Sequence, residues 1–563
     1  MDSEDSFEEE EEEPVSRART RRIVINLSQT QYEVVRDVAR SPLHWRLSYK
    51  EEEDGWDVCW IDTGMTPERL MRMKPYQKIN HFPGMYTLAR KNTLAGNLNN
   101  MKKLFPAEYN FFPATWVLPH DAVDFHNQFN EKRAKTFIVK PEASCQGRGI
   151  FLTRNYESIN SSERYVVQRY LHKPLLLDGL KFDLRVYVLV AGCEPLRIFI
   201  HEEGLARFAT ELYVAPARSN LAEMCMHLTN YAINKSNPNF VFNDSEQADD
   251  IGHKKSLTAL MRMLGEHGFD TEAIWKEIQR IIVRTLICAQ PLLSQTYRAC
   301  QPYDPSNGMC FEILGFDIFL DHRVKPWLLE VNHSPSFTTD TPLDRSIKER
   351  VILDAISLLG ILPENREKYY MQVKAQVQQR AMRGKDYQAL RSERLNLQRQ
   401  MMEERDKLEG KHTGGYHKIF PVEDEGQSQA LLEGAQKLLY EQTTGKPKPR
   451  KEEVKVESRP KAKPPTVPRL EASAEEPTPR RPATKLQPQR SVRKAVSVEP
   501  PKPSKVEISA VSRVKVEAVG RKMQQTSSRE RLRMQTTGEF VKPKTVELEV
   551  RLPTEGTART QRR

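Results

Sequence analysis

Residues Phe311–Phe337 read FEILGFDIFLDHRVKPWLLEVNHSPSF, and the fold of the chain is best derived from this stretch. Two apolar runs, Ile313–Leu320 and Val324–Val331, flank the polar residues Asp321–Arg323. Apolar runs of this length around a short polar turn are typical of a β-hairpin. The stretch therefore predicts two adjacent antiparallel strands.

Polar side chains interrupt both predicted strands where a buried strand would be apolar. Glu330 and Asn332 are two residues apart, so they share one face of their strand. The short turn brings Asp317 of the first strand across from them, within about a residue of register. Two adjacent carboxylates are costly without a cation, and a set of oxygen ligands suits Mg²⁺ that holds substrate phosphates. The alternative is an ordinary hairpin whose acids point to water.

Composition divides the chain into a globular front and a basic rear. The 563 residues have room for two to four domains, and the net charge is +11. Residues 441–563 contain 30 Lys and Arg against 15 Glu, and residues 345–420 contain 16 Lys and Arg against 10 acids. A basic rear half implies a polyanionic partner, which could be nucleic acid, a membrane surface or an acidic protein.

Cysteine usage and hydropathy predict the cellular compartment. The seven cysteines are scattered without a C-x-x-C pair, which predicts free thiols in a reducing compartment and no zinc site. No apolar run reaches about 18 residues, so we expect no membrane span. The N-terminus is acidic and has no apolar segment, unlike a secretory signal. These features predict a cytosolic or cytoskeletal protein.

The chain is expected to contain one folded core between low-complexity ends. Residues 23–63 alternate strand-like and helix-like pieces, which predicts a small N-terminal α/β domain. Leu257–Leu292 predicts one or two helices, and Leu431–Tyr440 an isolated helix. The expected segments are a disordered N-terminus (1–22), a catalytic core (23–362), a cationic helical region (363–420) and a disordered Pro/Lys/Arg-rich tail (421–563).

A glycine-containing loop follows one predicted strand. Thr136–Pro141 reads TFIVKP and leads into the polar loop Glu142–Ile150. Backbone N–H groups of the loop, together with Lys140, would supply a positive field for phosphates. Tyr165–Leu171 is a further strand whose backbone could pair with an adenine edge, although any core strand would look the same. A plain hairpin turn is the alternative for the loop, and no P-loop or protein-kinase signature occurs.

The strand KFDLRVYVLV carries charges on one face. Lys181, Asp183 and Arg185 alternate with apolar residues, which predicts the floor of a site, or else a solvent-exposed sheet face. Other polar residues of the same central region that could serve a nucleotide or substrate are Arg207, Thr229, Asn230 and Lys235.

This constellation permits two broad reactions, which are phosphoryl transfer to a hydroxyl and ATP-driven joining of a carboxylate to an amine. A hydroxyl kinase needs a base beside the metal, and the sequence shows none of that type. A ligase needs less, because a carboxylate attacks phosphorus without deprotonation and gives an acyl phosphate that an amine displaces. Catalysis is then positioning and charge neutralisation.

Four motifs together resemble the tubulin tyrosine ligase-like family. They are Lys181–Arg185, His227–Tyr231, Phe311–Asp317 and above all Trp327–Phe337. The resemblance runs from about residue 23 to 361, and the flanking helices resemble those of the polyglutamylase branch. It implies an α+β ATP-grasp fold in which two lobes close over ATP.

The resemblance also implies roles for individual residues. Asp317, Glu330 and Asn332 would be the Mg²⁺ ligands, while Arg185 would act with Glu330 in catalysis by neutralising the γ-phosphate and the acyl phosphate. The implied ATP contacts are Lys140, Gln146, Gly147, Arg148, Gly149, Gln168, Arg169, Tyr170, Leu171, Lys181, Asp183, Thr229 and Asn230. The residues implied to hold free glutamate are Arg207, Tyr231, Lys235 and Lys254. Gln146 and His333 resemble the pair found in enzymes that elongate chains through α-carboxylates.

The implied function is an ATP- and Mg²⁺-dependent polyglutamylase of tubulin C-terminal tails. The basic region after residue 345 would contact the acidic microtubule surface, in a monomer that needs no nucleic acid or membrane. The expected location is the cytoplasm and cytoskeleton, including the cilium with its axoneme or basal body. The alternatives are a glycine or tyrosine ligase of the same fold, a non-catalytic microtubule-binding protein, and a nucleic-acid-binding protein.

Overall fold

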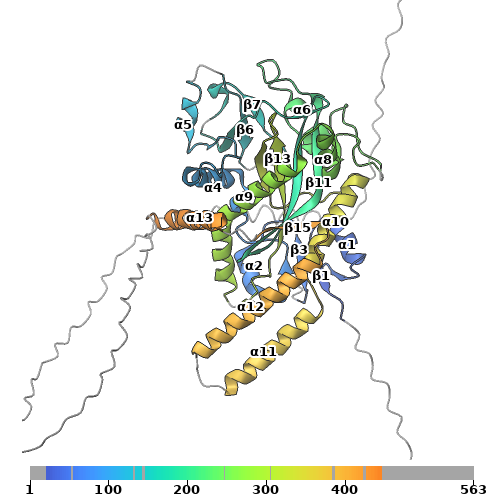
Figure 1. Cartoon of the computed structure of the whole chain (residues 1–563), viewed down its shortest axis with the longest axis vertical. Coiled ribbons are helices and arrows are strands. Elements are labelled where there is room, and N and C mark those ends of the chain that lie inside the picture. The colour runs from blue at the N-terminus through green and yellow to red at the C-terminus, as the bar shows by residue number, and fades with distance from the viewer. Residues whose placement is uncertain are drawn as a thin grey trace, which may run out of the picture. The chain divides into compact units, whose positions relative to one another are not determined.

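A computed structural model describes residues 21–446, apart from 52–54, 131–133, 143–145, 161, 246–247, 303, 305, 383–386 and 422–425. Within the helices, the side chains of 376–391, 393 and 394 are also outside the description. The disorder expected for residues 1–20 and 447–563 therefore concerns residues outside this range. The described chain is a mixed α/β structure with three sheets (Figure 1).

The largest sheet contains the hairpin predicted within Phe311–Phe337. Its order is β12-β11-β10-β13-β14, with β15 beside β11 and β9 beside β10. The predicted hairpin is confirmed, because β13 and β14 are antiparallel neighbours with Asp317 opposite Glu330. The strands are β9 (Leu176–Leu177), β10 (Leu180–Cys193), β11 (Leu196–Leu212), β12 (Lys254–Ser256), β13 (Glu312–Leu320), β14 (Pro326–Asn332) and β15 (Tyr416–Phe420).

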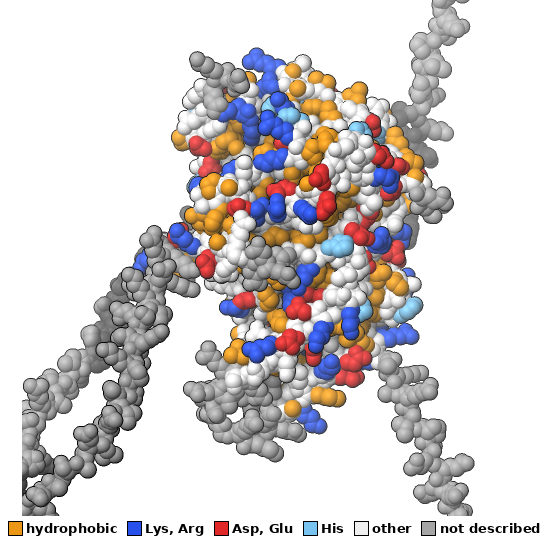
Figure 2. Space-filling view, in the orientation of Figure 1, with side chains coloured by type: hydrophobic (Ala, Val, Ile, Leu, Met, Phe, Trp, Pro, Cys, Tyr) orange, Lys and Arg blue, Asp and Glu red, His pale blue; other side chains and the backbone are white. Residues whose placement is uncertain are grey.

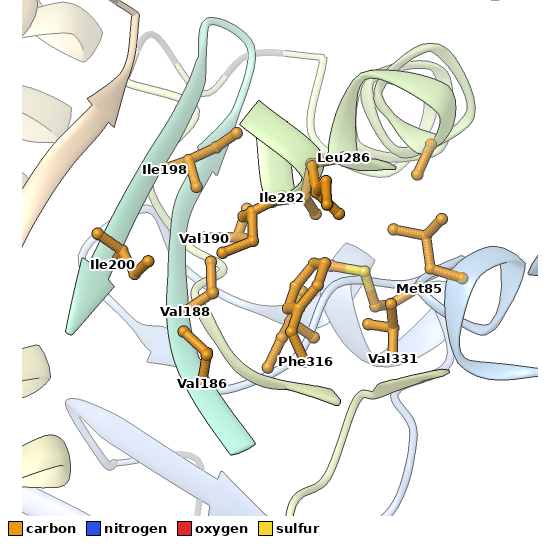
Figure 3. Packing of buried hydrophobic residues seen from close by; sticks show 14 of the residues in the cluster. Met85, Val186, Val188, Val190, Ile198, Ile200, Ile282, Leu286, Phe316 and Val331 are labelled. Atoms are coloured by element: carbon orange, nitrogen blue, oxygen red, sulfur yellow. The ribbon is translucent and has the colours of Figure 1, made fainter. Parts of the chain in front are cut away.

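One face of this sheet is an apolar core covered by helices. Val186, Val188 and Val190 alternate along β10 and point to the same side, where they meet Ile282 and Leu286 (Figure 3). All five side chains are fully buried. The opposite face carries Lys181, Asp183 and Arg185 at one end of β10 and a second apolar core at the other end.

The helices that cover this face are α8 (Leu257–Glu266) and α9 (Thr271–Cys300), so the segment predicted as one or two helices forms two. The break occurs at Gly268, whose φ of +81° lies in the left-handed region that favours glycine. Asp270 then caps α9 by accepting a hydrogen bond from the N–H of Ala273.

A parallel four-stranded sheet and α10 (Pro342–Leu358) pack against the other face. Tyr187 and Leu189 of β10 are buried there together with Trp60 and Val351. The strand order is β2-β1-β3-β4. The elements are β1 (Val24–Gln29), α1 (Glu33–Arg40), β2 (Arg46–Ser48), β3 (Val58–Ile61), α2 (Pro67–Arg72) and β4 (Lys78–Ile79).

The third sheet is antiparallel and has the order β5-β8-β6-β7. It has an aromatic core of its own that includes Trp116, Phe125 and Phe137. Its elements are β5 (Thr115–Val117), α5 (Ala122–Asn127), β6 (Phe137–Pro141), β7 (Phe151–Thr153), the 3₁₀ turn η1 (Tyr156–Ser158) and β8 (Tyr165–Arg169).

Four further helices are found among the described residues before α8. They are α3 (Tyr86–Ala89), α4 (Lys91–Leu104), α6 (Met224–His227) and α7 (Tyr231–Asn234). Over the part of the chain that the structure describes, no helix combines the length and the apolar character that crossing a membrane requires.

The region expected to be a cationic helical extension contains α11 (Glu364–Met382) and α12 (Tyr387–Lys411), which extend away from the sheets in Figure 1. The described side chains of α12 carry both charges, and Lys and Arg side chains mix with Asp and Glu side chains in this part of the molecule (Figure 2). The described part of α12 is therefore not a uniformly basic surface. The exposed cations on these helices include Lys368, Lys374, Arg399, Lys407 and Lys411.

Disorder from residue 421 onward was expected, and α13 (Gly426–Thr444) corrects this expectation. The helix is not isolated either, because Leu431 and Ala435 are buried in the main core. A Cβ atom on Gly434 would lie 2.5 Å from the ring of Phe105. Glycine at this position lets α13 approach the end of α4 closely. Composition missed the helix because its burial depends on distant partners.

The end of α12 is fastened to the large sheet by buried charges. The Arg197 side chain of β11 donates a hydrogen bond to Glu409 at 2.5 Å, and both side chains are 4% exposed. Arg405 donates to the same carboxylate at 2.8 Å. Asp406, which is half exposed, accepts a further bond from Arg197 at 2.7 Å. We refer to Arg197, Arg405, Asp406 and Glu409 as the α12 clamp.

Candidate active site

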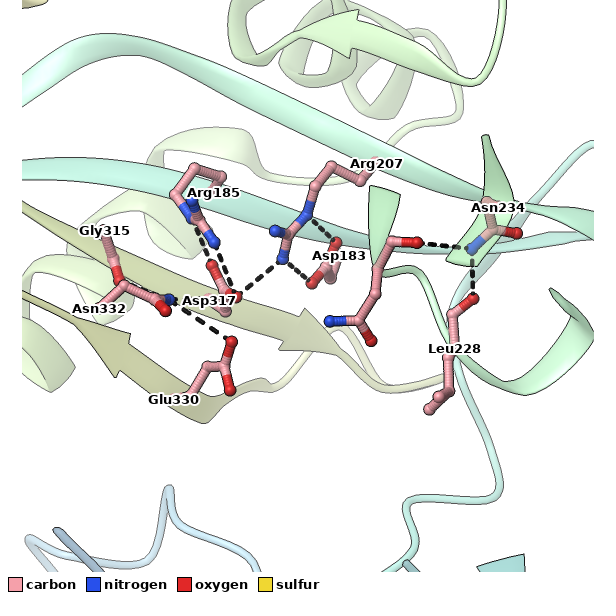
Figure 4. Close-up of polar contacts among 10 residues, drawn as sticks. Asp183, Arg185, Arg207, Leu228, Asn234, Gly315, Asp317, Glu330 and Asn332 are labelled. Atoms are coloured by element: carbon pink, nitrogen blue, oxygen red, sulfur yellow. Dashed lines mark hydrogen bonds and ion pairs between the residues drawn. The ribbon is translucent and has the colours of Figure 1, made fainter. Parts of the chain in front are cut away.

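The hairpin brings the three predicted metal ligands together. The Nδ2 atom of Asn332 lies 3.5 Å from an oxygen of Asp317 and 3.5 Å from an oxygen of Glu330 (Figure 4). Asp317 is only 2% exposed. Asp317 therefore does not point to bulk water, which was the alternative for an ordinary hairpin, whereas Glu330 is partly exposed.

Two arginines from neighbouring strands surround Asp317. Arg185, opposite Asp317 in the register of β10 and β13, donates to both of its carboxylate oxygens at 2.5 and 3.1 Å. Arg207 of β11 lies 2.9 Å from Asp317 and also donates to Asp183 at 2.9 Å (Figure 4). Asp183 is buried. The charged face of KFDLR is thus not a solvent-exposed sheet face, and its role as the floor of a site stays a prediction.

The two carboxylates are electrostatically unequal. Burial by itself would raise the pKa of Asp317, but Arg185 and Arg207 hold it well below its usual value. Burial, followed by the charge of Asp317, raises the pKa of Glu330 above its usual value. Repulsion between adjacent carboxylates is what a bound divalent cation would relieve.

The donor set fits a hard cation. The described residues contain no group of three or more His, Cys, Asp or Glu side chains placed to share a metal. The third protein ligand would therefore be the amide oxygen of Asn332, whose Nδ2 donates to the carbonyl of Gly315 at 3.3 Å. Two carboxylates and an amide oxygen suit Mg²⁺ better than a softer metal.

Lys140 of β6 is one of two buried lysines among the predicted ATP contacts. Its Nζ donates to the Oε1 of Gln168 at 3.1 Å, and Gln168 donates to Thr115 at 2.9 Å. Burial lowers the pKa of Lys140 to about 8, although Glu330 acts in the opposite direction. Lys140 therefore interacts electrostatically with Glu330, one of the predicted metal ligands.

Lys181 is the second buried lysine. It donates to the hydroxyl of Tyr170 at 3.2 Å and to the carbonyl of His227 at 2.7 Å. The Nζ atom also lies 5.4 Å from the ring centroid of Phe319. Burial lowers the pKa of Lys181 to about 7. A lysine with a depressed pKa and neutral partners is well suited to meet an incoming anion.

The glycine loop lies against α7. A Cβ atom on Gly147 would be 2.5 Å from Ile233 and 3.5 Å from Asn230, so a larger residue would displace the loop. Arg148 donates to the side chain of Gln146 at 2.8 Å. Of the other predicted ATP contacts, Thr229 is buried, Arg169 lies over the ring of Phe137, Gly149 is exposed, and Leu171 is partly buried after β8.

Two of the residues predicted to bind free glutamate, Lys254 and Lys235, lie beside a third, Tyr231. The Nζ atoms of Lys254 and Lys235 lie 3.8 and 5.3 Å from the Tyr231 ring centroid. Lys254 is also opposite Arg207 in the register of β11 and β12. Its ammonium group is already paired with the buried carboxylate of Asp344 at 2.6 Å, and Lys348 binds the same carboxylate at 2.9 Å.

Gln146 and His333, the pair predicted to select the acceptor carboxylate, have different neighbours in the structure. His333 is next to His81, with ring centroids 5.8 Å apart, and burial lowers its pKa. Gln146 is exposed on the glycine loop. No contact recorded between described residues joins the two side chains. Their shared role stays a prediction.

Sequence reasoning missed Lys91, Asp344 and Lys348. Lys91 begins α4, and its charge acts on both Glu330 and Lys140. The signal was a basic cluster at a helix start, which is equally typical of a solvated helix end. Asp344 and Lys348 are one turn apart on α10 and pair with each other. They carried no signal, because Lys254, the other partner of Asp344, is 90 residues away from it in the chain.

A model of the tubulin-tyrosine ligase family matches residues 69–369, which is more than half of the chain. The chain belongs to the tubulin-tyrosine ligase family. The charged hairpin, the KFDLR strand and the glycine loop all fall within the matched region. The predicted family is therefore confirmed, while the individual residue roles stay predictions.

Several relatives of this chain within the tubulin-tyrosine ligase family are named tubulin polyglutamylases. It is 52% identical over 427 residues to a probable beta-tubulin polyglutamylase of Tetrahymena thermophila, with 75% of this chain and 36% of the relative covered. It is 47% identical over 412 residues to tubulin polyglutamylase TTLL13 of Mus musculus, with 72% and 50% covered. It is 44% identical over 424 residues to tubulin polyglutamylase ttll6 of Danio rerio, with 75% and 53% covered. The chain thus spans between about a third and a half of the length of these relatives.

Proposed function

We propose that this chain is an ATP- and Mg²⁺-dependent ligase that adds glutamate to glutamate residues of tubulin C-terminal tails. The observation that carries the proposal is the cluster of Asp317, Glu330 and Asn332 beside Arg185 and Arg207. Relatives at 44–52% identity that are named tubulin polyglutamylases support the choice of substrate.

The reaction that suits this site has two steps. An acceptor carboxylate attacks the γ-phosphorus of ATP, ADP leaves, and an acyl phosphate forms. The amine of free glutamate then attacks the acyl carbon, phosphate leaves, and the amide forms with loss of the amine proton. Arg185 would neutralise charge on the transferred phosphoryl group, while Mg²⁺ held by the hairpin would neutralise the ATP phosphates.

An ATP-grasp arrangement would place ATP between the sheet β5-β8-β6-β7 and the large sheet. Lys140 comes from the first sheet and Lys181 from the second, and both are buried. The charge of Glu330 acts on Lys140, which supports a nucleotide that spans from these lysines to the hairpin.

Glutamate as the added amino acid is supported by the cations around Tyr231. Lys254, Lys235 and Arg207 would face a substrate that carries two carboxylates, whereas glycine or tyrosine carries one. Gln146 and His333 would favour elongation through α-carboxylates. We propose a monomeric enzyme of the cytoplasmic and ciliary cytoskeleton, in which α11 and α12 contact the microtubule without nucleic acid or membrane.

Mass spectrometry of microtubules incubated with the protein, ATP and glutamate tests this function. We expect successive additions of single glutamate residues to the tubulin tails, and fewer additions as salt rises, because exposed charges are screened. Parallel reactions with glycine or tyrosine test the other ligase activities. Transfer of one of these amino acids in place of glutamate, or no transfer at all, would contradict the proposal.

ATP binding is expected to take up protons. The pKa values of Lys181 (about 7) and Lys140 (about 8) are low because burial disfavours the ammonium form, and polyphosphate would raise both. At about pH 8 both lysines would gain protons on binding, whereas at about pH 6 both already carry them. Calorimetry of ATP binding in two buffers with different ionisation enthalpies measures this uptake. A Lys181→Met variant should show a smaller uptake, and buffer-independent heats at pH 8 would contradict the assignment.

A further inference from the structure

Tyr187 has a buried hydroxyl group that the protein does not satisfy. The residue is on β10, two positions after Arg185, so both side chains are on the same face of the sheet, where Tyr187 begins the apolar core that follows the charged residues. Its side chain is 0% exposed, and its hydroxyl has no hydrogen-bond partner among the residues that the structure describes. Buried polar groups almost always have a partner, so this exception calls for an explanation.

The surroundings of Tyr187 explain why an aromatic ring is buried at this position, but they do not explain why the ring carries a hydroxyl group. The ring stacks on Phe337, with centroids 6.3 Å apart and an interplanar angle of 17°. The residue opposite Tyr187 on the neighbouring strand β13 is Gly315, which has no side chain that could accept a hydrogen bond. Phenylalanine would pack equally well at this position and would avoid the cost of a buried unpaired hydroxyl.

The hydroxyl lies within the electrostatic field of the candidate active site. Burial raises the pKa of Tyr187 well above its usual value, and the charges of Arg185, Asp344, Arg207 and Asp317 all act on it. The group is therefore a protonated donor near the arginines that surround Asp317. One of the charges that act on the pKa of Tyr187 is Asp344, the partner of the proposed glutamate-binding Lys254.

We propose that Tyr187 is a further substrate-contacting residue, whose hydroxyl donates a hydrogen bond to an anionic oxygen of the substrates that meet at Asp317. The oxygen would belong to a carboxylate or to the transferred phosphoryl group. This inference rests on the proposed ligase function, and it adds to that function a neutral donor among charged ones. A donor that is unpaired in the free protein gains its partner only when substrate binds.

The test is Tyr187→Phe, which removes one oxygen atom and keeps the ring on Phe337. Because the hydroxyl has no partner to lose, we expect the melting temperature to stay the same or rise slightly. Because hydrogen bonds to charged groups are strong, we expect kcat/KM for ligation to fall roughly 10- to 100-fold. A higher KM for glutamate alone would identify a glutamate carboxylate. A lower kcat with unchanged KM values would identify the phosphoryl oxygen.

Tyr416→Phe is a matched control. Tyr416 is equally buried in the same core, but its hydroxyl donates to the carbonyl of Val351 at 3.2 Å. This control should lower the melting temperature and leave kcat and KM unchanged, which is the opposite pattern. If Tyr187→Phe leaves kcat and every KM unchanged, or if it lowers only the melting temperature, the hydroxyl has no substrate partner and the inference is wrong. If the wild type transfers glycine or tyrosine, the proposed function fails, and the comparison of Tyr187→Phe with wild type is made with that amino acid.

Discussion

Replacing Glu330 by glutamine is expected to lower kcat/KM for ligation by roughly 100-fold or more. The substitution keeps the size of the side chain but removes one of the two carboxylates beside Asn332. Loss of a supporting residue around a bound metal typically costs 10- to 100-fold, so loss of a ligand should cost at least as much. Steady-state kinetics with ATP, Mg²⁺, glutamate and an acidic tail peptide measure the effect.

The same variant is expected to be more stable than the wild type when Mg²⁺ is absent. Burial and Asp317 raise the pKa of Glu330, so ionising this residue costs more in the folded protein than in the unfolded chain. Below the unfolded pKa of about 4.3 Glu330 is protonated in both states, and the penalty is absent. As the pH rises through the folded pKa, the penalty grows to its full value. Melting curves in chelator from about pH 4 to 8 should therefore show an increasing advantage for Glu330→Gln.

Glu272→Gln provides the control for both measurements. Glu272 is 77% exposed on α9 and, among the described residues, pairs with Lys276 at the surface. Its replacement should leave kcat/KM unchanged and change stability by less than about 0.5 kcal/mol. Full activity of Glu330→Gln would exclude the hairpin as the metal site. A loss of stability in chelator would exclude the proposed repulsion between Asp317 and Glu330.

Glu409→Gln is expected to destabilise the protein by about 3 kcal/mol. Glu409 is the buried acceptor of the α12 clamp, where it binds both Arg197 and Arg405. Removing one partner of a buried ion pair is strongly destabilising, because the remaining charge is left without compensation. Urea unfolding at neutral pH measures the loss, and hydrogen exchange should locate it in residues 395–411 of α12.

Asp406→Asn is the matched variant for the clamp. Asp406 binds the same arginine but is 52% exposed, so water can replace it. We expect a loss below about 1 kcal/mol. Equal losses for the two variants would mean that burial does not distinguish the two carboxylates. Unchanged stability of Glu409→Gln would show that α12 is not held by the clamp.

The local alternation of residue types was sufficient to predict which side chains share a face in the strands of the candidate active site. The alternation of apolar and polar residues in the hairpin placed Asp317, Glu330 and Asn332 on one face, and the structure has Asp317 opposite Glu330. The same period in KFDLR placed Asp183 and Arg185 on the polar face of β10. In a strand, the side chain at every second position has the same direction, so spacing alone carries this information.

Other parts of the site depend on which strands and helices become neighbours. Arg185 and Asp317 are 132 residues apart, and Lys254 and Asp344 are 90 residues apart. Nothing within either segment specifies these partners, because a lysine or aspartate beside a strand is more often a surface charge. Predicting such pairs requires knowing which strands and helices lie next to one another, and only the folded chain supplies this information.

Tertiary packing also decided the structure of residues 416–420 and 426–444. Composition after residue 420 predicts disorder, yet α13 buries Leu431 and Ala435. Residues 416–420 were predicted to belong to a helical region, yet they form β15, which pairs with β11. Short apolar stretches such as these cannot form a core alone, and they become ordered only because an existing helix and an open strand edge receive them. The residue types determined which chemistry the chain can perform. The distant contacts determined which of its charges meet, because burial and pairing are properties of the whole fold.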